Sequence, residues 1–152
     1  MGMIGNNPYD LESALNNWEY DPENEANNIR LIHGADGKRK LQIRTYEDGI
    51  HGISQMNADG RPDGKKPYGH EFAYEFYSTL IFNNFDDSGN PITHFVLSSN
   101  ASNELIEESR LIFKRYELFN WLGFYKDVIE DTERDIAALD LVIGYANNLE
   151  DR

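Results

Sequence analysis

The feature that most constrains this chain is a Gly-, Pro- and Asp-rich stretch at residues 55–71, where strand-like sequence ends and helix-like sequence begins. The pairs Asp59-Gly60 and Asp63-Gly64 suit backbone positions with positive φ. Pro62 and Pro67 fix φ and lack an amide donor. Together these residues predict a rigid, shaped connection between a β part and an α part.

The sequence before this stretch predicts a three-stranded antiparallel meander. Apolar and polar residues alternate in three short runs, and each pair of runs is separated by a turn that contains Gly. The strands are expected at residues 29–33, 38–45 and 50–57, with turns at 34–37 and 46–49.

After the stretch the apolar period becomes helical. A connecting helix is expected from residue 69, with Phe72, Phe76 and Leu80 on one face, and the apolar run 92–97 indicates either a strand or a buried connector. An antiparallel helical hairpin follows. Its first helix is capped by Ser98 or Ser99, it turns at Gly123, and its second helix has the apolar residues Tyr125, Val128, Ile129, Thr132, Ile136, Leu139 and Val142.

The whole chain, residues 1–152, is expected to form one α+β domain. In the N-terminal arm, Asp10 is a candidate cap for a short helix that carries Leu11, Leu15 and Trp18, and Trp18 is expected to hold the arm on the body. The expected parts are an arm (1–28), the meander and loop (29–68), a helix and connector (69–98), and the hairpin (99–152).

Composition excludes several classes of site and compartment. The chain has no cysteine, which excludes disulfides, thiolate catalysis and cysteine-ligated metals. No apolar run approaches the length of about 18 residues that spans a membrane, and the N-terminus lacks a signal-peptide pattern. We therefore expect a cytoplasmic protein that is not inserted in a membrane.

The net charge of −13 is unevenly distributed. Residues 29–70 carry eight Lys or Arg against five Asp or Glu, whereas residues 1–28 carry six acids and no Lys or Arg. The acidic balance disfavours direct binding to nucleic acid, which depends on phosphate neutralisation. The basic block indicates either internal neutralisation or an anion site formed by Lys38, Arg39, Lys40, Lys65 and Lys66.

Two family resemblances add to this interpretation. The run Trp121-Leu122-Gly123-Phe124-Tyr125, followed by Asp131 and Ala137, resembles the middle of a tetratricopeptide repeat. Over residues 28–146 the chain is similar to a little-characterised bacterial family with a Gln-Met strand, here Gln55-Met56, and a Gly-Arg-Pro-Asp-Gly signature, here residues 60–64.

That second resemblance implies a β-meander joined to tetratricopeptide-like helices, and it implies no activity. Members of the family are described as carrying a C-terminal UVR motif, a helical hairpin that mediates partner contacts in excision-repair proteins. This chain has extra residues around 46–50 and stops at Arg152, where relatives continue into that motif. We expect a truncated or short member, to which roles of the UVR motif do not transfer.

The loop also supplies candidate site residues. Asp59, Asp63, His70 and Glu71 are metal-ligand types close in sequence, but an EF-hand starting at Asp59 would place Arg61 at its third position. Turn and helix-start roles are favoured for Asp59, Asp63 and Glu71. Arg61 is expected to hold a carboxylate, either an internal one such as Asp63 or Glu71, or one on a partner.

The aromatic residues of the hairpin favour a different function. Trp121, Phe124 and Tyr125 belong to a set of aromatics too large for one small hairpin to bury on one side, and a single repeat leaves a face uncovered. We therefore expect a non-enzymatic module that binds a protein partner or a second copy. No catalytic residue, cofactor or metal is assigned. The alternative is a small metal-dependent or acid–base enzyme that uses the loop from Asp59 to Glu71.

Overall fold

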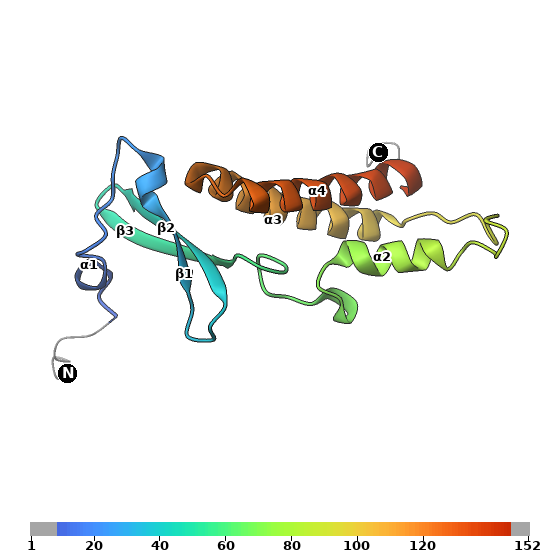
Figure 1. The fold of residues 1–152 in the computed structure, drawn as a ribbon, viewed down its shortest axis with the longest axis horizontal. Helices are drawn as coiled ribbons and strands as arrows, with labels where there is room; N and C mark the ends of the chain where they lie inside the picture. The colour runs from blue at the N-terminus through green and yellow to red at the C-terminus, as the bar shows by residue number, and fades with distance from the viewer. Residues whose placement is uncertain (1–8, 147–152) are drawn as a thin grey trace.

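The computed structural model describes residues 9–146 and has an α+β fold, as predicted. Three strands form one sheet, and a helical hairpin follows it after a connecting helix (Figure 1). The elements in chain order are α1 (Leu11–Ala14), η1 (Glu25–Asn28), β1 (Ile29–His33), β2 (Arg39–Glu47), β3 (Ile50–Asn57), η2 (Pro67–Gly69), α2 (Ala73–Phe82), α3 (Ser99–Leu122) and α4 (Tyr125–Tyr145).

The sheet is the expected antiparallel meander, with β2 in the centre. Leu41 of β2 pairs with Leu31 on one side and with Met56 on the other. β2 extends beyond the predicted strand to Glu47, because the turn into β3 needs only Asp48 and Gly49. Their φ angles of 51° and 81° are the two positive values that a tight type I′ hairpin turn requires.

The hairpin of α3 and α4 is capped as the sequence predicts. The Ser98 side chain accepts a hydrogen bond from the Ala101 amide at 3.1 Å, and Gly123 ends α3 with a φ of 74°. α2 packs against both helices of the hairpin. Their shared apolar core contains Ala73, Tyr77, Leu97, Ala101, Leu105, Ala138, Val142 and Ala146.

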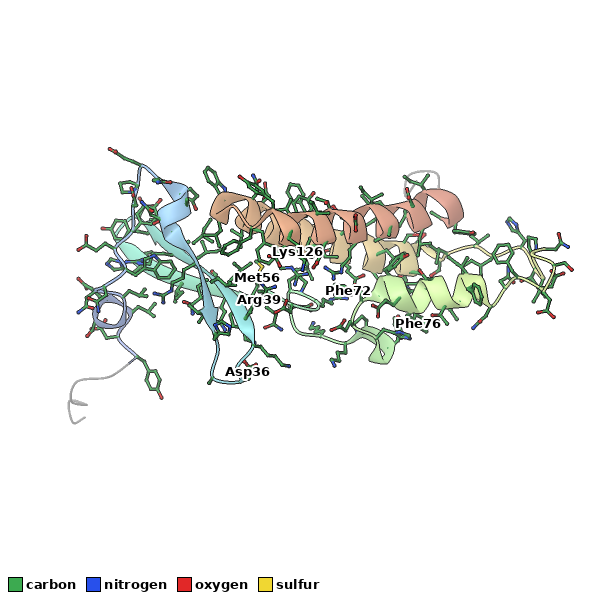
Figure 2. All side chains as sticks on the ribbon, in the orientation of Figure 1. Asp36, Arg39, Met56, Phe72, Phe76 and Lys126 are labelled. Atoms are coloured by element: carbon green, nitrogen blue, oxygen red, sulfur yellow. The ribbon has the colours of Figure 1, made fainter. Side chains whose placement is uncertain are left out.

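The sheet packs against the end of the hairpin where α3 ends and α4 begins (Figure 1). Ile29 and Leu41 form a second core there with Leu118 and Phe119, and Figure 2 shows Arg39 and Met56 at this junction. This core fixes the sheet to the helices through one face only.

The N-terminal arm covers part of the opposite face of the sheet. The Trp18 indole donates to the Asn27 carbonyl at 2.8 Å, and the Arg30 guanidinium lies 3.9 Å from the centre of the Trp18 ring. Asp10 caps α1 by accepting from the Glu12 amide. α1 ends at Ala14, however, so the predicted helix through Trp18 is too long.

The segment between α2 and α3 is a connector and not a strand. Leu97 is buried and its amide donates to the Tyr145 carbonyl at 2.8 Å, while Ile92 is 62% exposed. The connecting helix also begins later than predicted, at Ala73, because Pro67–Gly69 form a separate 3-10 turn in which Tyr68 has a φ of 53°.

Candidate functional site

The Gly- and Pro-rich loop between β3 and α2 is held by a buried arginine of α3. Arg115 is 1% exposed and donates through Nη1 to the carbonyls of Asn57 at 3.1 Å and Gly60 at 2.6 Å. Its Nε and Nη2 donate to the two carboxylate oxygens of Asp131 in α4, each at 2.8 Å. One guanidinium therefore joins the loop, α3 and α4 by charge-assisted hydrogen bonds.

A buried carboxylate of α3 holds the start of α2. Glu108 is fully buried and accepts from the amides of Ala73 at 2.7 Å and Tyr74 at 3.0 Å, and from Arg61 Nη1 at 3.0 Å. It thus satisfies two of the free amides at this helix start. Burial raises the pKa of Glu108, while these amides and Arg61 oppose the rise.

Glu108 fills the place that the sequence assigned to Glu71. Glu71 was predicted at an early helical position, but the helix begins two residues later and Glu71 is exposed outside it. Phe72 is the N-cap residue and offers no side-chain hydrogen bond. Because the loop folds back onto α3, the helix start is capped from a neighbouring helix.

The other loop residues pair with arginines. Arg61 Nε donates to Asp63 at 3.0 Å, which is one of the internal carboxylates predicted for it. Asp63 also accepts from the Lys65 amide at 3.0 Å. Asp59 does not bind its own turn. It accepts from Arg39 at 2.6 and 3.0 Å, and these hydrogen bonds hold the pKa of Asp59 below its usual value.

The residues needed by the enzymatic alternative do not come together as a metal site. Within residues 9–146, no three His, Asp or Glu side chains are grouped so that they could hold a metal ion. Asp59 and Asp63 each pair with an arginine, and His70 lies 3.9 Å from Glu75 in α2. Asp59 and Asp63 therefore serve ion pairs within the fold.

The basic block is likewise partly neutralised. Arg39 also donates to Asp127 of α4 at 2.9 Å, and Lys40 pairs with Asp36 at 3.2 Å and with the Asn57 side chain at 2.7 Å. Lys65 and Lys66 do not converge with this group, because they line a cleft to which Lys38, Arg39 and Lys40 do not contribute.

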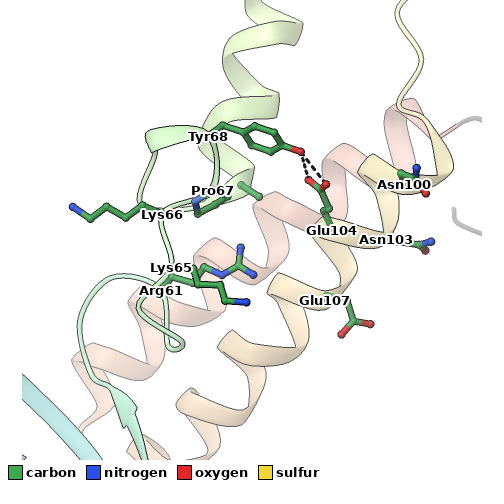
Figure 3. A pocket seen from close by; sticks show the side chains of 10 residues that line it. Arg61, Lys65, Lys66, Pro67, Tyr68, Asn100, Asn103, Glu104 and Glu107 are labelled. Carbon is green, nitrogen blue, oxygen red and sulfur yellow. Dashed lines mark hydrogen bonds between the residues drawn. The ribbon is translucent and has the colours of Figure 1, made fainter.

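That cleft, about 690 Å³ in volume, lies between the loop and α3 (Figure 3). Lys65 and Lys66 line one wall, and Glu104 and Glu107 line the other. Glu104 accepts hydrogen bonds from Tyr68 at 2.8 and 2.9 Å and from Tyr77 at 2.6 Å. The opposed charges of the walls offer no concentrated site for an anion or a cation.

The hairpin carries an exposed apolar surface on α4. We call it the α4 stripe, and it consists of Tyr125, Ile129, Thr132, Ile136, Leu139 and Ile143. Of these, Tyr125, Ile129, Ile136 and Ile143 are between 57% and 64% exposed. The buried residues of α4, such as Asp135, Ala138 and Val142, lie on a different face of the helix, against α3 and α2.

The predicted aromatic candidates lie at the end of this surface. Trp121 is 55% exposed, and Phe124 and Tyr125 are also exposed, but only Tyr125 belongs to the α4 stripe. The stripe was not predicted, because the apolar residues of α4 were expected to share one face and lie on two. The signal was available, since residues 125, 129, 132, 136, 139 and 143 follow a strict four-then-three spacing.

Comparison with protein-family models, with curated proteins and with solved structures finds no match to this chain. The two resemblances stated above therefore stay predictions. Across the described part of the chain, no helix has both the length and the apolar character that crossing a membrane requires.

Proposed function

We propose that this protein is a non-enzymatic interaction module whose α4 stripe is covered by a second copy of the same chain. The observation that carries the proposal is the row of exposed isoleucines at Ile129, Ile136 and Ile143, one heptad apart on a helix whose buried residues lie on another face. Exposed apolar surface of this extent is typical of an interaction site.

The spacing of the stripe suits a helical partner. Four-then-three spacing is the pattern of positions a and d in a coiled coil, with Ile129, Ile136 and Ile143 at a. Tyr125, Thr132 and Leu139 then occupy d. A second α4 offers the same pattern, so the seam is self-complementary, as a two-fold symmetric interface requires.

The area is sufficient for two copies. The stripe exposes on the order of 600 Å² in one copy. Two copies would bury on the order of 1,200 Å², at the lower edge of specific protein–protein interfaces.

Charge supports an antiparallel arrangement. If the two α4 helices pair antiparallel about a point near Arg134, Ile129 faces Leu139 of the second copy, and Ile136 faces its Thr132. Lys126 then lies opposite Asp140 of the second copy, and this attraction occurs twice. Glu133 approaches Glu133 of the second copy across the axis. This repulsion occurs once, whereas the attraction between Lys126 and Asp140 occurs twice.

The enzymatic and anion-binding alternatives have less support. The first needs loop carboxylates free for chemistry, whereas Asp59 and Asp63 are engaged by Arg39 and Arg61. The second needs a converging group of cations, whereas Arg39 already contacts two carboxylates.

Sedimentation velocity of the full chain tests the proposal. We expect the unmodified protein to form dimers, and Ile136→Asp to raise the dimer Kd at least about 100-fold, because a charge enters the seam once from each copy. Phe82→Asp is the matched control, since Phe82 is 77% exposed but lies on α2 away from the stripe. Monomers at all concentrations, or equal weakening by both variants, would contradict the proposal.

A further inference from the structure

A second cavity, independent of the α4 stripe, lies between the N-terminal arm and the outer face of the sheet. Its volume is about 510 Å³. The arm contributes Leu15, Tyr20 and Pro22, and the sheet contributes Arg44, Tyr46 and His51. Glu12 and Glu19, both exposed, lie among its lining residues on the arm. The cavity is of a size typical of small-molecule sites.

Arg44 is a buried cation without an anion. Arg44 is 3% exposed and forms no ion pair within the described residues. Its acceptors are the Trp18 carbonyl at 3.1 Å, the Thr45 carbonyl at 2.6 Å, the Gly52 carbonyl at 3.5 Å and His51 Nδ1 at 2.7 Å. Three of these acceptors are backbone carbonyls, and none of the four is a carboxylate.

Arg44 also has donor capacity to spare. A guanidinium carries five N–H groups, and these contacts use four, so one N–H on Nη2 has no acceptor among residues 9–146. Arg115 of α3, which is buried to a similar degree, is instead compensated by both oxygens of Asp131. A buried charge that lacks such compensation is costly, and an anion that reaches it is bound correspondingly well.

The hydrogen bond between Arg44 and His51 determines which nitrogen of the imidazole is the acceptor, and aromatic rings line the cavity beside it. Arginine can only donate, so His51 Nδ1 is the acceptor of this hydrogen bond and the ring N–H lies on Nε2. The Tyr46 ring lies between two others, 4.8 Å from His51 and 6.1 Å from Tyr20. These rings, with Leu15 and Pro22, give the cavity apolar and aromatic walls around one cation.

We infer that this cavity binds a small organic carboxylate with an aromatic or apolar body, its carboxylate directed at Arg44. The planar guanidinium suits a carboxylate, and the ring-lined walls suit the body of the ligand. Glu12 and Glu19 oppose an anion, but their exposed charges are screened by water and salt, whereas the buried guanidinium is not.

Titration of the full chain with phenylacetate, followed by NMR chemical shifts and calorimetry, tests the inference. Phenylacetamide has the same shape without the charge. We expect saturable phenylacetate binding that involves Arg44 and His51, and affinity for the amide at least about tenfold lower, as expected for loss of a buried charge-assisted contact. Equal affinity for both compounds, or no saturable phenylacetate binding, would overturn the inference.

Variants extend this test. Arg44→Met should abolish the preference for the carboxylate, but it removes contacts of the fold and can unfold the arm. The double variant Glu12→Gln/Glu19→Gln changes exposed residues only, and we expect it to bind phenylacetate several-fold more tightly at low salt. Unchanged or weaker binding by this variant would place the carboxylate elsewhere and overturn the assignment.

Discussion

Glu108, in the middle of α3, is the residue at which the loop and two helices meet. It accepts hydrogen bonds from two amides of α2 and from Arg61 of the loop, with no access to water. A carboxylate in this position is expensive to desolvate and is tolerated because its partners surround it. The junction of loop and helices thus depends on polar contacts as well as on apolar packing.

The raised pKa of Glu108 predicts a component of the pH dependence of stability. Between the ordinary value of 4.5 and the higher pKa in the folded state, the folded protein binds more protons than the unfolded chain. The free energy of unfolding therefore falls as pH rises through this interval. We expect Glu108→Gln to lose this component in urea unfolding measured across the interval.

Glu107→Gln is the matched control, because Glu107 is the neighbouring residue, is exposed, and within the described part of the chain forms an ion pair with Arg110 alone. Its profile should keep the slope of the unmodified protein. Parallel profiles for Glu108→Gln and the unmodified protein would show that Glu108 does not titrate as its burial implies.

Part of this junction could be predicted from the sequence, and there is a physical reason why the rest could not. Arg61 was expected to bind a nearby acid, and it does bind Asp63. Glu108, Arg115 and Asp131 were missed because charged residues on an amphipathic helix ordinarily face water. Their burial follows from the loop folding back onto α3, a contact between residues far apart in sequence that local patterns do not predict.

At the scale of helices and strands, local sequence patterns were sufficient to predict an element where one pattern alone determined it. Strand alternation and Asp-Gly turns predicted the meander, and Ser98 and Gly123 predicted the ends of α3. The apolar pattern did not predict which residues are buried where a helix has more than one apolar face. α4 has one apolar face against α2 and α3 and a second one exposed, and the sequence alone does not say which face is covered.

The proposed pairing of the two α4 helices predicts a charge-reversal result. Lys126→Glu and Asp140→Lys should each weaken dimerisation several-fold, because each places like charges opposite one another twice. The double variant should recover most of the affinity, since it restores opposite charges in reversed order. Additive weakening in the double variant, measured by sedimentation equilibrium, would contradict the antiparallel register.

At the scale of the whole molecule, net charge opposes self-association. Each copy carries a charge of −13, so two copies repel one another over distances that salt screens. The seam itself has both signs along its edge, because Lys126, Glu133 and Asp140 occupy the same position in successive heptads. Long-range repulsion should therefore weaken association, while the local attraction between Lys126 and Asp140 of the second copy favours it.

Salt dependence follows from this balance. Dimerisation of the full chain should tighten when NaCl is raised from about 20 mM to about 300 mM, because the Debye length shortens from roughly 20 Å to under 10 Å. Light scattering at fixed protein concentration measures the change. Weakening with salt would instead indicate that oppositely charged surfaces dominate, as for a basic partner of the acidic chain.

The most direct measurement of the central proposal is the distance between two copies of α4. Because the chain has no cysteine, Glu133→Cys and Lys126→Cys can each carry a single nitroxide for pulsed electron paramagnetic resonance. The antiparallel dimer predicts a short separation for labels at residue 133. It predicts an axial separation of about 20 Å for labels at residue 126, because they lie fourteen residues apart along the paired helices. Absence of dipolar coupling at residue 133 would show that the α4 stripe is not covered by a second copy.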